Sequence, residues 1–206
     1  SFVELATWAT EIRMAYAWAS TQGGVGQHWR ALPLAKVTRA IIGTHFLQTE
    51  PAAIAALMNE APGRLRVVSD SGGVFHPKVI VGLNGSEVRA IVGSSNLTGG
   101  GFGGNTELNV LLIGTTSDTA IADLLRFLDE AWTHPRVFEP TAEWLARYTE
   151  AYVMRPRPPL VPSGVLPASE VTSERDLDVD WDRYVALIRS QERRQLANGH
   201  RIRIFD

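Results

Sequence analysis

Three short segments decide the fold of this chain: Phe75-His76-Pro77-Lys78-Val79-Ile80-Val81, then Gly93-Ser94-Ser95-Asn96-Leu97-Thr98, then Asn105-Thr106-Glu107. The first segment is apolar and β-branched after the lysine, which predicts a buried strand over 75–82. In a strand, residues two apart lie on the same face, so the side chains of His76 and Lys78 should project together. This pair combines a nucleophile or base with a fixed cation.

The second and third segments add hydrogen-bonding groups to this pair. Gly93 and Ser94 leave a second predicted strand, and a tight turn there aims the Ser94 hydroxyl and the Asn96 amide at one spot, as donors to phosphate oxygens. Glu107 begins a third strand, where its carboxylate can accept the far ring N–H of a histidine and fix the tautomer. The five side chains predict a phosphate-binding site with an oriented imidazole.

Each of these residues also has an ordinary structural interpretation. A histidine in a strand is commonly a satisfied core or edge residue, and a strand lysine is commonly solvated. Ser94 and Asn96 belong to the residue types that dominate turns for conformational reasons. Glu107 can be a surface charge at the start of a strand. The functional interpretation is preferred because the five residue types occur together and in chemical agreement.

The elements around these segments predict an α/β fold. Helical spacing or start signals appear over 2–9, 27–35, 49–59, 118–132 and 141–153, and strands are expected over 11–18, 37–42, 64–69, 87–92 and 108–113. Thr49 is expected to cap the third helix, and the run 108–113, apolar except for Asn109, is typical of a strand covered on both faces. Strands that first alternate with helices and then follow one another indicate a mixed β-sheet sandwiched between helices.

Composition predicts one compact domain and a tail. Residues 1–154 are expected to form the domain, 155–179 a proline-rich and acidic linker, and 180–206 a helix and strand that begin a further domain. The chain has 206 residues, 45% of them hydrophobic, with a net charge of −2. These values exclude a disordered protein and a uniformly basic nucleic-acid coat, but not a local positive cleft. No run approaches the roughly 18 apolar residues of a membrane span, and the absence of cysteine excludes thiolate chemistry.

The motif resembles the signature of the phospholipase D superfamily, H-x-K-x4-D-x6-G-S-x-N with a glutamate further on. The matching positions, in order, are His76, Lys78, Gly93, Ser94, Asn96 and Glu107. The chain departs from the signature at the aspartate, where Leu83 stands, and in a longer gap before the glycine. The variant resembles the branch that contains metal-independent restriction endonucleases and the nuclease modules attached to helicases.

The resemblance implies a phosphodiesterase, foremost a DNA endonuclease, that forms a covalent phosphohistidine on His76. It implies that Lys78, Ser94 and Asn96 hold the phosphate oxygens, that Glu107 belongs to the catalytic set, and that no metal or cofactor is required. A homodimer sharing one site, a DNA or RNA substrate, a helicase or specificity module as partner, a cytoplasmic location and a role in restriction or phage defence are further expectations. A non-catalytic nucleic-acid-binding or assembly module and, less favoured, a lipid phosphodiesterase remain the alternatives.

Two weaker features stay open. His45, at the end of a predicted strand, can face the same cleft as His76 or serve only in packing, and packing is preferred. The glycine-rich loop 99–104 with Phe102 can touch the substrate or simply connect two strands.

Overall fold

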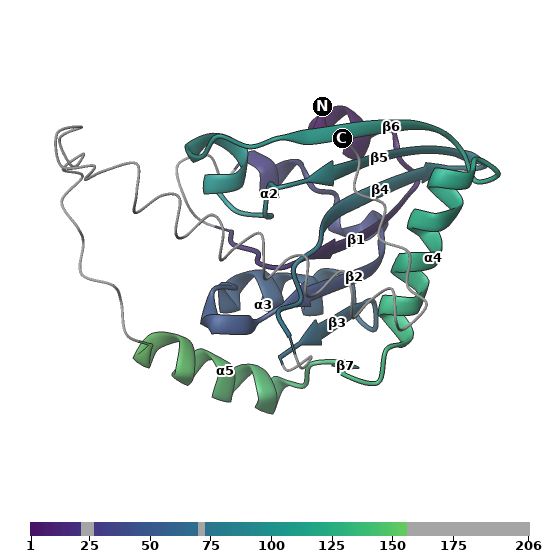
Figure 1. Cartoon of the computed structure of the whole chain (residues 1–206). Coiled ribbons are helices and arrows are strands. Elements are labelled where there is room, and N and C mark those ends of the chain that lie inside the picture. Colours follow the sequence, from purple (N-terminus) through teal and green to yellow (C-terminus); the bar gives the residue numbers. More distant parts are fainter. Residues whose placement is uncertain (22–26, 70–72, 156–206) are drawn as a thin grey trace, which may run out of the picture. The chain divides into compact units, whose positions relative to one another are not determined.

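A seven-stranded sheet forms the centre of the computed structural model, which describes residues 1–21, 27–69 and 73–155 (Figure 1). The strand order is β6-β5-β4-β1-β2-β3-β7. The strands are β1 (Glu11–Tyr16), β2 (Val37–Gly43), β3 (Leu65–Val68), β4 (Lys78–Asn84), β5 (Glu87–Gly93), β6 (Asn109–Thr115) and β7 (Val137–Phe138). Strands β1, β2 and β3 run parallel to one another, and every other pairing is antiparallel. The predicted mixed sheet is confirmed.

Helices pack on both faces of this sheet, as predicted. They are α1 (Phe2–Trp8), α2 (Gln27–Ala31), α3 (Pro51–Glu60), α4 (Thr119–Thr133) and α5 (Ala142–Met154). Alternate residues of β1 separate the two cores: Ile12 and Met14 pack with α1, α3 and α5, whereas Ala15 packs on the side of α4. Short turns link these elements at η1 (Leu34–Lys36), η2 (His45–Leu47) and η3 (Gly100–Gly104), the last a single π-helical turn.

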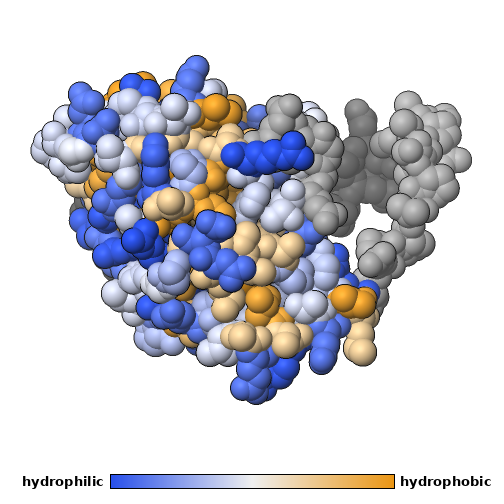
Figure 2. Space-filling model, turned by 180° about the vertical axis from the view of Figure 1, so that it is seen from behind, coloured by the Kyte–Doolittle hydropathy of each residue, from blue (hydrophilic) through white to orange (hydrophobic). Residues whose placement is uncertain are grey.

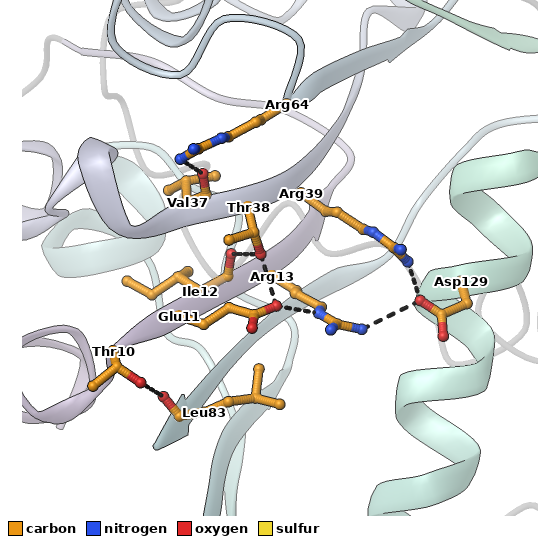
Figure 3. Close-up of polar contacts among 10 residues, drawn as sticks. All are labelled: Thr10, Glu11, Ile12, Arg13, Val37, Thr38, Arg39, Arg64, Leu83 and Asp129. Carbon is orange, nitrogen blue, oxygen red and sulfur yellow. Dashed lines mark hydrogen bonds and ion pairs between the residues drawn. The ribbon is translucent and has the colours of Figure 1, made fainter. Parts of the chain in front are cut away.

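Polar contacts fasten α4 to the middle of the sheet (Figure 3). Asp129 of α4 accepts a hydrogen bond of 3.3 Å from Arg13 and pairs with Arg39. The guanidinium groups of Arg39 and Arg66 lie over the ring of Trp132, at 5.7 and 4.6 Å from its centroid. These arginines are therefore engaged in helix packing.

The prediction that strand 108–113 is covered on both faces is wrong. Strand β6 is the edge of the sheet, and apolar side chains on both of its faces reach solvent: Ile113 is 69% exposed, and Val110 and Leu111 are also exposed. Leu108, just before the strand, is 79% exposed. Figure 2 shows apolar surface among polar residues, including at the top of the molecule, where β6 lies in Figure 1. A run of consecutive apolar residues cannot distinguish an inner strand from an edge strand that keeps an apolar surface.

The predicted cap of the third helix is also wrong. Helix α3 begins at Pro51 as expected, but its N-cap is Glu50, without a side-chain hydrogen bond. The Thr49 hydroxyl instead donates to the Gly43 carbonyl at 2.5 Å and accepts from the Ala19 N–H at 3.3 Å. Tertiary partners at the ends of β1 and β2 have thus taken the hydroxyl that local capping would use.

The compact unit runs from Ser1 to Pro156. Its last described helix ends at Met154, next to the boundary predicted for the domain. The linker and the further helix and strand predicted after residue 155 lie outside the described residues.

Candidate active site

The predicted site segments meet at one end of the sheet. Lys78 opens β4 opposite Tyr16, the last residue of β1. Gly93 closes β5 opposite Asn109, the first residue of β6. The antiparallel pairing of β4 with β5 and of β5 with β6 therefore brings together segments separated by up to 30 residues of sequence.

His76 and Lys78 are in direct contact. The histidine lies in the extended segment before β4 and is exposed, and the Pro77 carbonyl that follows accepts a hydrogen bond of 2.8 Å from Ala17. Lys78 Nζ lies 2.8 Å from His76 Nδ1 and from Nε2, and it donates to the His76 carbonyl at 3.0 Å. The shared projection predicted from the spacing is thus present, although the histidine lies just outside the strand.

The surroundings of His76 favour its neutral, nucleophilic form. Partial desolvation lowers the pKa of the imidazole below its ordinary value, and the Lys78 ammonium lowers it further. Burial also lowers the pKa of Lys78, while the Glu107 carboxylate acts in the opposite direction and favours the ammonium. A cation held against a neutral imidazole is suited to receive a phosphate dianion or diester.

Ser94 and Glu107 form a second contact in the site. The Ser94 hydroxyl donates to Glu107 and accepts from the Leu108 N–H at 3.0 Å. Asn105 donates to the other carboxylate oxygen at 3.1 Å. These hydrogen bonds, Ser94 first and then Asn105, and the charge of Lys78 hold the pKa of Glu107 below its ordinary value. Within the described residues the carboxylate makes no hydrogen bond to His76, so the expected fixing of the tautomer by Glu107 is not found in one chain.

Asn96 lies near the same site, because the residue after it is hydrogen-bonded to the segment that follows β1. The Leu97 N–H, one residue later, donates to the Trp18 carbonyl at 3.1 Å. Asn96 Oδ1 is buried and has no hydrogen-bond partner in the described part of the chain. A buried amide oxygen without a partner is costly in a folded protein. This oxygen is an acceptor, so a phosphate oxygen could bind only to the Nδ2 of the same amide. Gly101 packs so closely on the Asn96 backbone that a side chain there would clash.

Trp18 is a site residue that sequence reasoning missed. Its ring lies edge-on to the His76 ring, with centroids 5.3 Å apart and planes at 75°, and Lys78 Nζ is 5.7 Å from its centroid. Ser95 and Asn109 were also missed; Asn109 Nδ2 donates to the buried Ser95 hydroxyl at 2.7 Å. The signal for Trp18 in the sequence was its position at the end of the strand predicted over 11–18.

A cavity of about 450 Å³ opens beside these groups. Lys78, Ser95 and Glu107 line it together with apolar residues, among them Phe2, Phe102, Val110 and Leu111. Phe102 of the glycine-rich turn therefore faces the cavity, in agreement with the substrate-contact alternative for that loop, and it also stacks on the buried His28 at 4.9 Å. The cavity places a cation and a carboxylate at the edge of an apolar surface.

The position at which the signature has an aspartate lies far from His76 and Lys78. Leu83 is five residues after Lys78 along β4, about 17 Å at strand spacing. Its side chain is buried on the α4 face, among Val81 and Val88, whereas Lys78 lines the cavity on the opposite side. The leucine therefore packs the core and does not touch the site.

Titration of His76 provides a direct test of this geometry. Because both desolvation and the Lys78 charge disfavour the imidazolium, we expect the His76 ring to titrate below the ordinary histidine value of about 6.5. Replacing Lys78 with methionine removes one of the two causes, so the midpoint should rise toward that value. NMR titration of the ring C–H signals, with the His76 signal identified by its loss in His76→Ala, measures both midpoints. A midpoint that falls or stays constant in Lys78→Met would contradict the contact.

Two other kinds of feature are absent from the described residues. No group of three or more histidine, aspartate or glutamate side chains in ranges 1–21, 27–69 and 73–155 is arranged to hold a metal ion. In the same ranges no helix has the length and apolar character needed to cross a bilayer.

Comparison with known proteins finds similarity in structure only. No protein-family model matches the chain, and no curated protein matches it. The solved structure of Nuc from Salmonella typhimurium, described as a phospholipase D family member, is 22% identical with a TM-score of 0.48, over 68% of this chain and 89% of that one. NucT from Helicobacter pylori is 15% identical with a TM-score of 0.41, over 63% of this chain and 83% of that one. At these identities the similarity concerns the fold alone.

Proposed function

We propose that this protein is a phosphodiesterase that cleaves nucleic acid, foremost a DNA endonuclease, through a covalent phosphohistidine. The observation that carries the proposal is the contact between Lys78 Nζ and the His76 ring, next to Ser94 and Glu107 at one end of the sheet. It combines a nucleophile in its neutral form with a cation and hydroxyl placed to bind phosphate oxygens. The resemblance of the motif to the phospholipase D signature agrees with this chemistry.

The reaction proceeds in two in-line displacements. A ring nitrogen of His76 uses its lone pair to form a bond to phosphorus, and the bond between phosphorus and the leaving oxygen breaks as a second histidine protonates that oxygen. Water then attacks the phosphohistidine, the N–P bond breaks, and the second histidine takes the proton from the water. Lys78, Ser94 and Asn96 hold the non-bridging oxygens, where charge is stabilised during transfer.

The second histidine is His76 of another copy of the chain. A single chain offers one such motif, and nucleophile and proton donor must act on opposite sides of phosphorus. The exposed apolar residues of β6 support a homodimer, because Leu108 directly follows Glu107, and Val110 and Leu111 line the cavity that contains Lys78. Apolar surface that is continuous with a site is typical of an interface that completes it.

Cleavage should persist in the presence of EDTA. In this mechanism His76 replaces a metal-activated water and the Lys78 ammonium replaces the Lewis acid, so chelation removes nothing that the reaction needs. Purified full-length protein is assayed with excess EDTA on plasmid DNA, on single-stranded DNA and RNA, and on phospholipid vesicles. Loss of cleavage in EDTA with recovery on adding magnesium would contradict the mechanism.

The same assay separates the alternatives. Cleavage of phospholipid but not of nucleic acid would make the protein a lipid phosphodiesterase. Binding of nucleic acid without cleavage of any of these substrates would make it a binding or assembly module. A role in restriction or phage defence, with a helicase or specificity module as partner, also belongs to the proposal. Because the partner would supply the specificity, the isolated protein should cleave DNA without sequence preference.

A further inference from the structure

A second cavity lies at the same end of the sheet as His76. It has a volume of about 450 Å³, within the range of about 300–1,000 Å³ typical of small-molecule sites. Turn η2 and helix α5 form it, and its lining includes His45, Phe46, Trp144, Arg147 and Tyr148. His45, which can be either a cleft residue or a packing residue from the sequence, thus lines this cavity.

The cavity lies close to the catalytic segment. A Cβ placed on Gly43, the last residue of β2, would lie 2.6 Å from the Ala17 carbonyl and 3.3 Å from the Phe75 carbonyl. The end of β2 therefore packs against the backbone that leads directly into His76. Phe46 is three residues beyond Gly43, so its backbone lies within about 11 Å of that contact.

The Phe46 side chain is exposed to solvent, and its backbone has an unfavourable conformation. Its side chain is 66% exposed, and both it and Leu47 have left-handed φ angles, of 59° and 53°. Such angles are costly for residues other than glycine, and they persist where the surrounding structure imposes them, often at binding sites. The fold therefore presents an aromatic ring to solvent at a conformational cost.

The opposite wall supplies aromatic rings and a cation. Trp144 and Tyr148 stack with centroids 5.1 Å apart, and the Tyr148 hydroxyl donates to the Thr49 carbonyl at 2.7 Å, which fixes α5 against the segment between η2 and α3. Arg147 is exposed at the rim, where it pairs with Glu143 at 3.6 Å, and such an exposed pair contributes little to stability. Its guanidinium is free to exchange this partner for a phosphate.

We propose that the cavity between η2 and α5 binds one nucleotide of an unpaired nucleic-acid strand, adjacent to the phosphate cleaved at His76. The base stacks on Phe46 and the phosphate pairs with Arg147. Aromatic rings combined with a cation are the usual means of holding single strands, because every base offers a face for stacking. A base-paired duplex keeps its bases stacked inside, out of reach of Phe46, so the proposal specifies single-stranded or locally opened substrate. It rests on the nuclease function proposed above.

Binding is measured by fluorescence anisotropy of a labelled single-stranded oligonucleotide, and of the matching duplex, in a His76→Ala background that prevents cleavage. Phe46→Gly should weaken single-strand binding about tenfold, whereas Phe46→Tyr should bind like the parent protein. Glycine accepts a left-handed backbone, so Phe46→Gly should melt no lower than the parent, which separates lost binding from lost folding. Duplex binding should change less than single-strand binding.

Arg147→Ala should weaken binding and reduce the slope of log K against log salt by about one phosphate contact. Its matched control is Arg126→Ala. Arg126 lies on α4, where it pairs with Asp123, and its side chain is 65% exposed, compared with 70% for Arg147. Arg126→Ala should leave binding and its salt dependence close to those of the parent protein.

Hydrolysis of bis(p-nitrophenyl) phosphate distinguishes failure of this proposal from failure of the nuclease function. A diester this small, when bound at His76, does not need the η2–α5 cavity, so the His76-containing forms of Phe46→Gly and Arg147→Ala should hydrolyse it at the parent rate. Unchanged single-strand binding by Phe46→Gly, or an equal loss on duplex, would overturn the nucleotide site. A change of molecular mass in Phe46→Gly, measured by sedimentation, would assign the cavity to contacts between copies and overturn it as well. A parent protein that hydrolyses no diester refutes the nuclease function, while the binding measurements still decide the nucleotide site.

Discussion

Replacing His76 with alanine should lower the rate of phosphodiester cleavage by about 10³-fold or more, with the fold intact. In the proposed mechanism the substitution removes the nitrogen that attacks phosphorus, and the loss of a nucleophile is among the largest single effects on enzyme activity. The side chain is exposed and lies before β4, so no core contact is lost. Initial rates on DNA, thermal unfolding and binding of uncleaved DNA measure the three expected results.

His134→Ala is the matched control for this experiment. His134 is also an exposed histidine outside the regular elements, and its ring accepts a hydrogen bond of 3.2 Å from the nearby Arg136 N–H. The control should cleave DNA at nearly the parent rate. Substantial turnover by His76→Ala, or an equal loss in both variants, would show that His76 is not the nucleophile.

A dimer of one parent chain and one His76→Ala chain should be almost inactive. If the catalytic centre contains His76 from both chains, the mixed dimer keeps a nucleophile or a proton donor but never both. Two neighbouring imidazoles titrate as a coupled pair, so one neutral and one protonated ring can coexist and divide these tasks. Mixed dimers purified through two different tags should retain a few per cent of parent activity or less.

Independent centres would give a different result. Each parent chain would then act alone, and the mixed dimer would keep about half of the parent activity, which would refute the shared centre. Ile113→Asp provides a second measurement, because Ile113 is exposed on β6 and a charge there disfavours an apolar interface. This variant should sediment as a monomer and lose cleavage while its thermal unfolding stays close to that of the parent.

The local pattern of residues was sufficient to predict most of the elements and the composition of the candidate site. Strand alternation gave the shared projection of His76 and Lys78, and their contact follows from the two-residue period of an extended chain. The apolar periodicity of 118–132 and 141–153 placed α4 and α5 within one residue of their observed bounds. These features depend on near neighbours in sequence, which is why the sequence alone determined them.

Other features depend on which segments become neighbours in space. The strand order made β6 an edge, so the apolar run at 108–113 reached solvent rather than the core. The packing of Gly43 against the Phe75 backbone brought η2 and its exposed Phe46 toward His76. Trp18 came to lie against His76, and Glu107 took Ser94 as its partner, through strand pairings between distant segments. Local periodicity fixes which face a side chain occupies, but only tertiary pairing decides what covers that face.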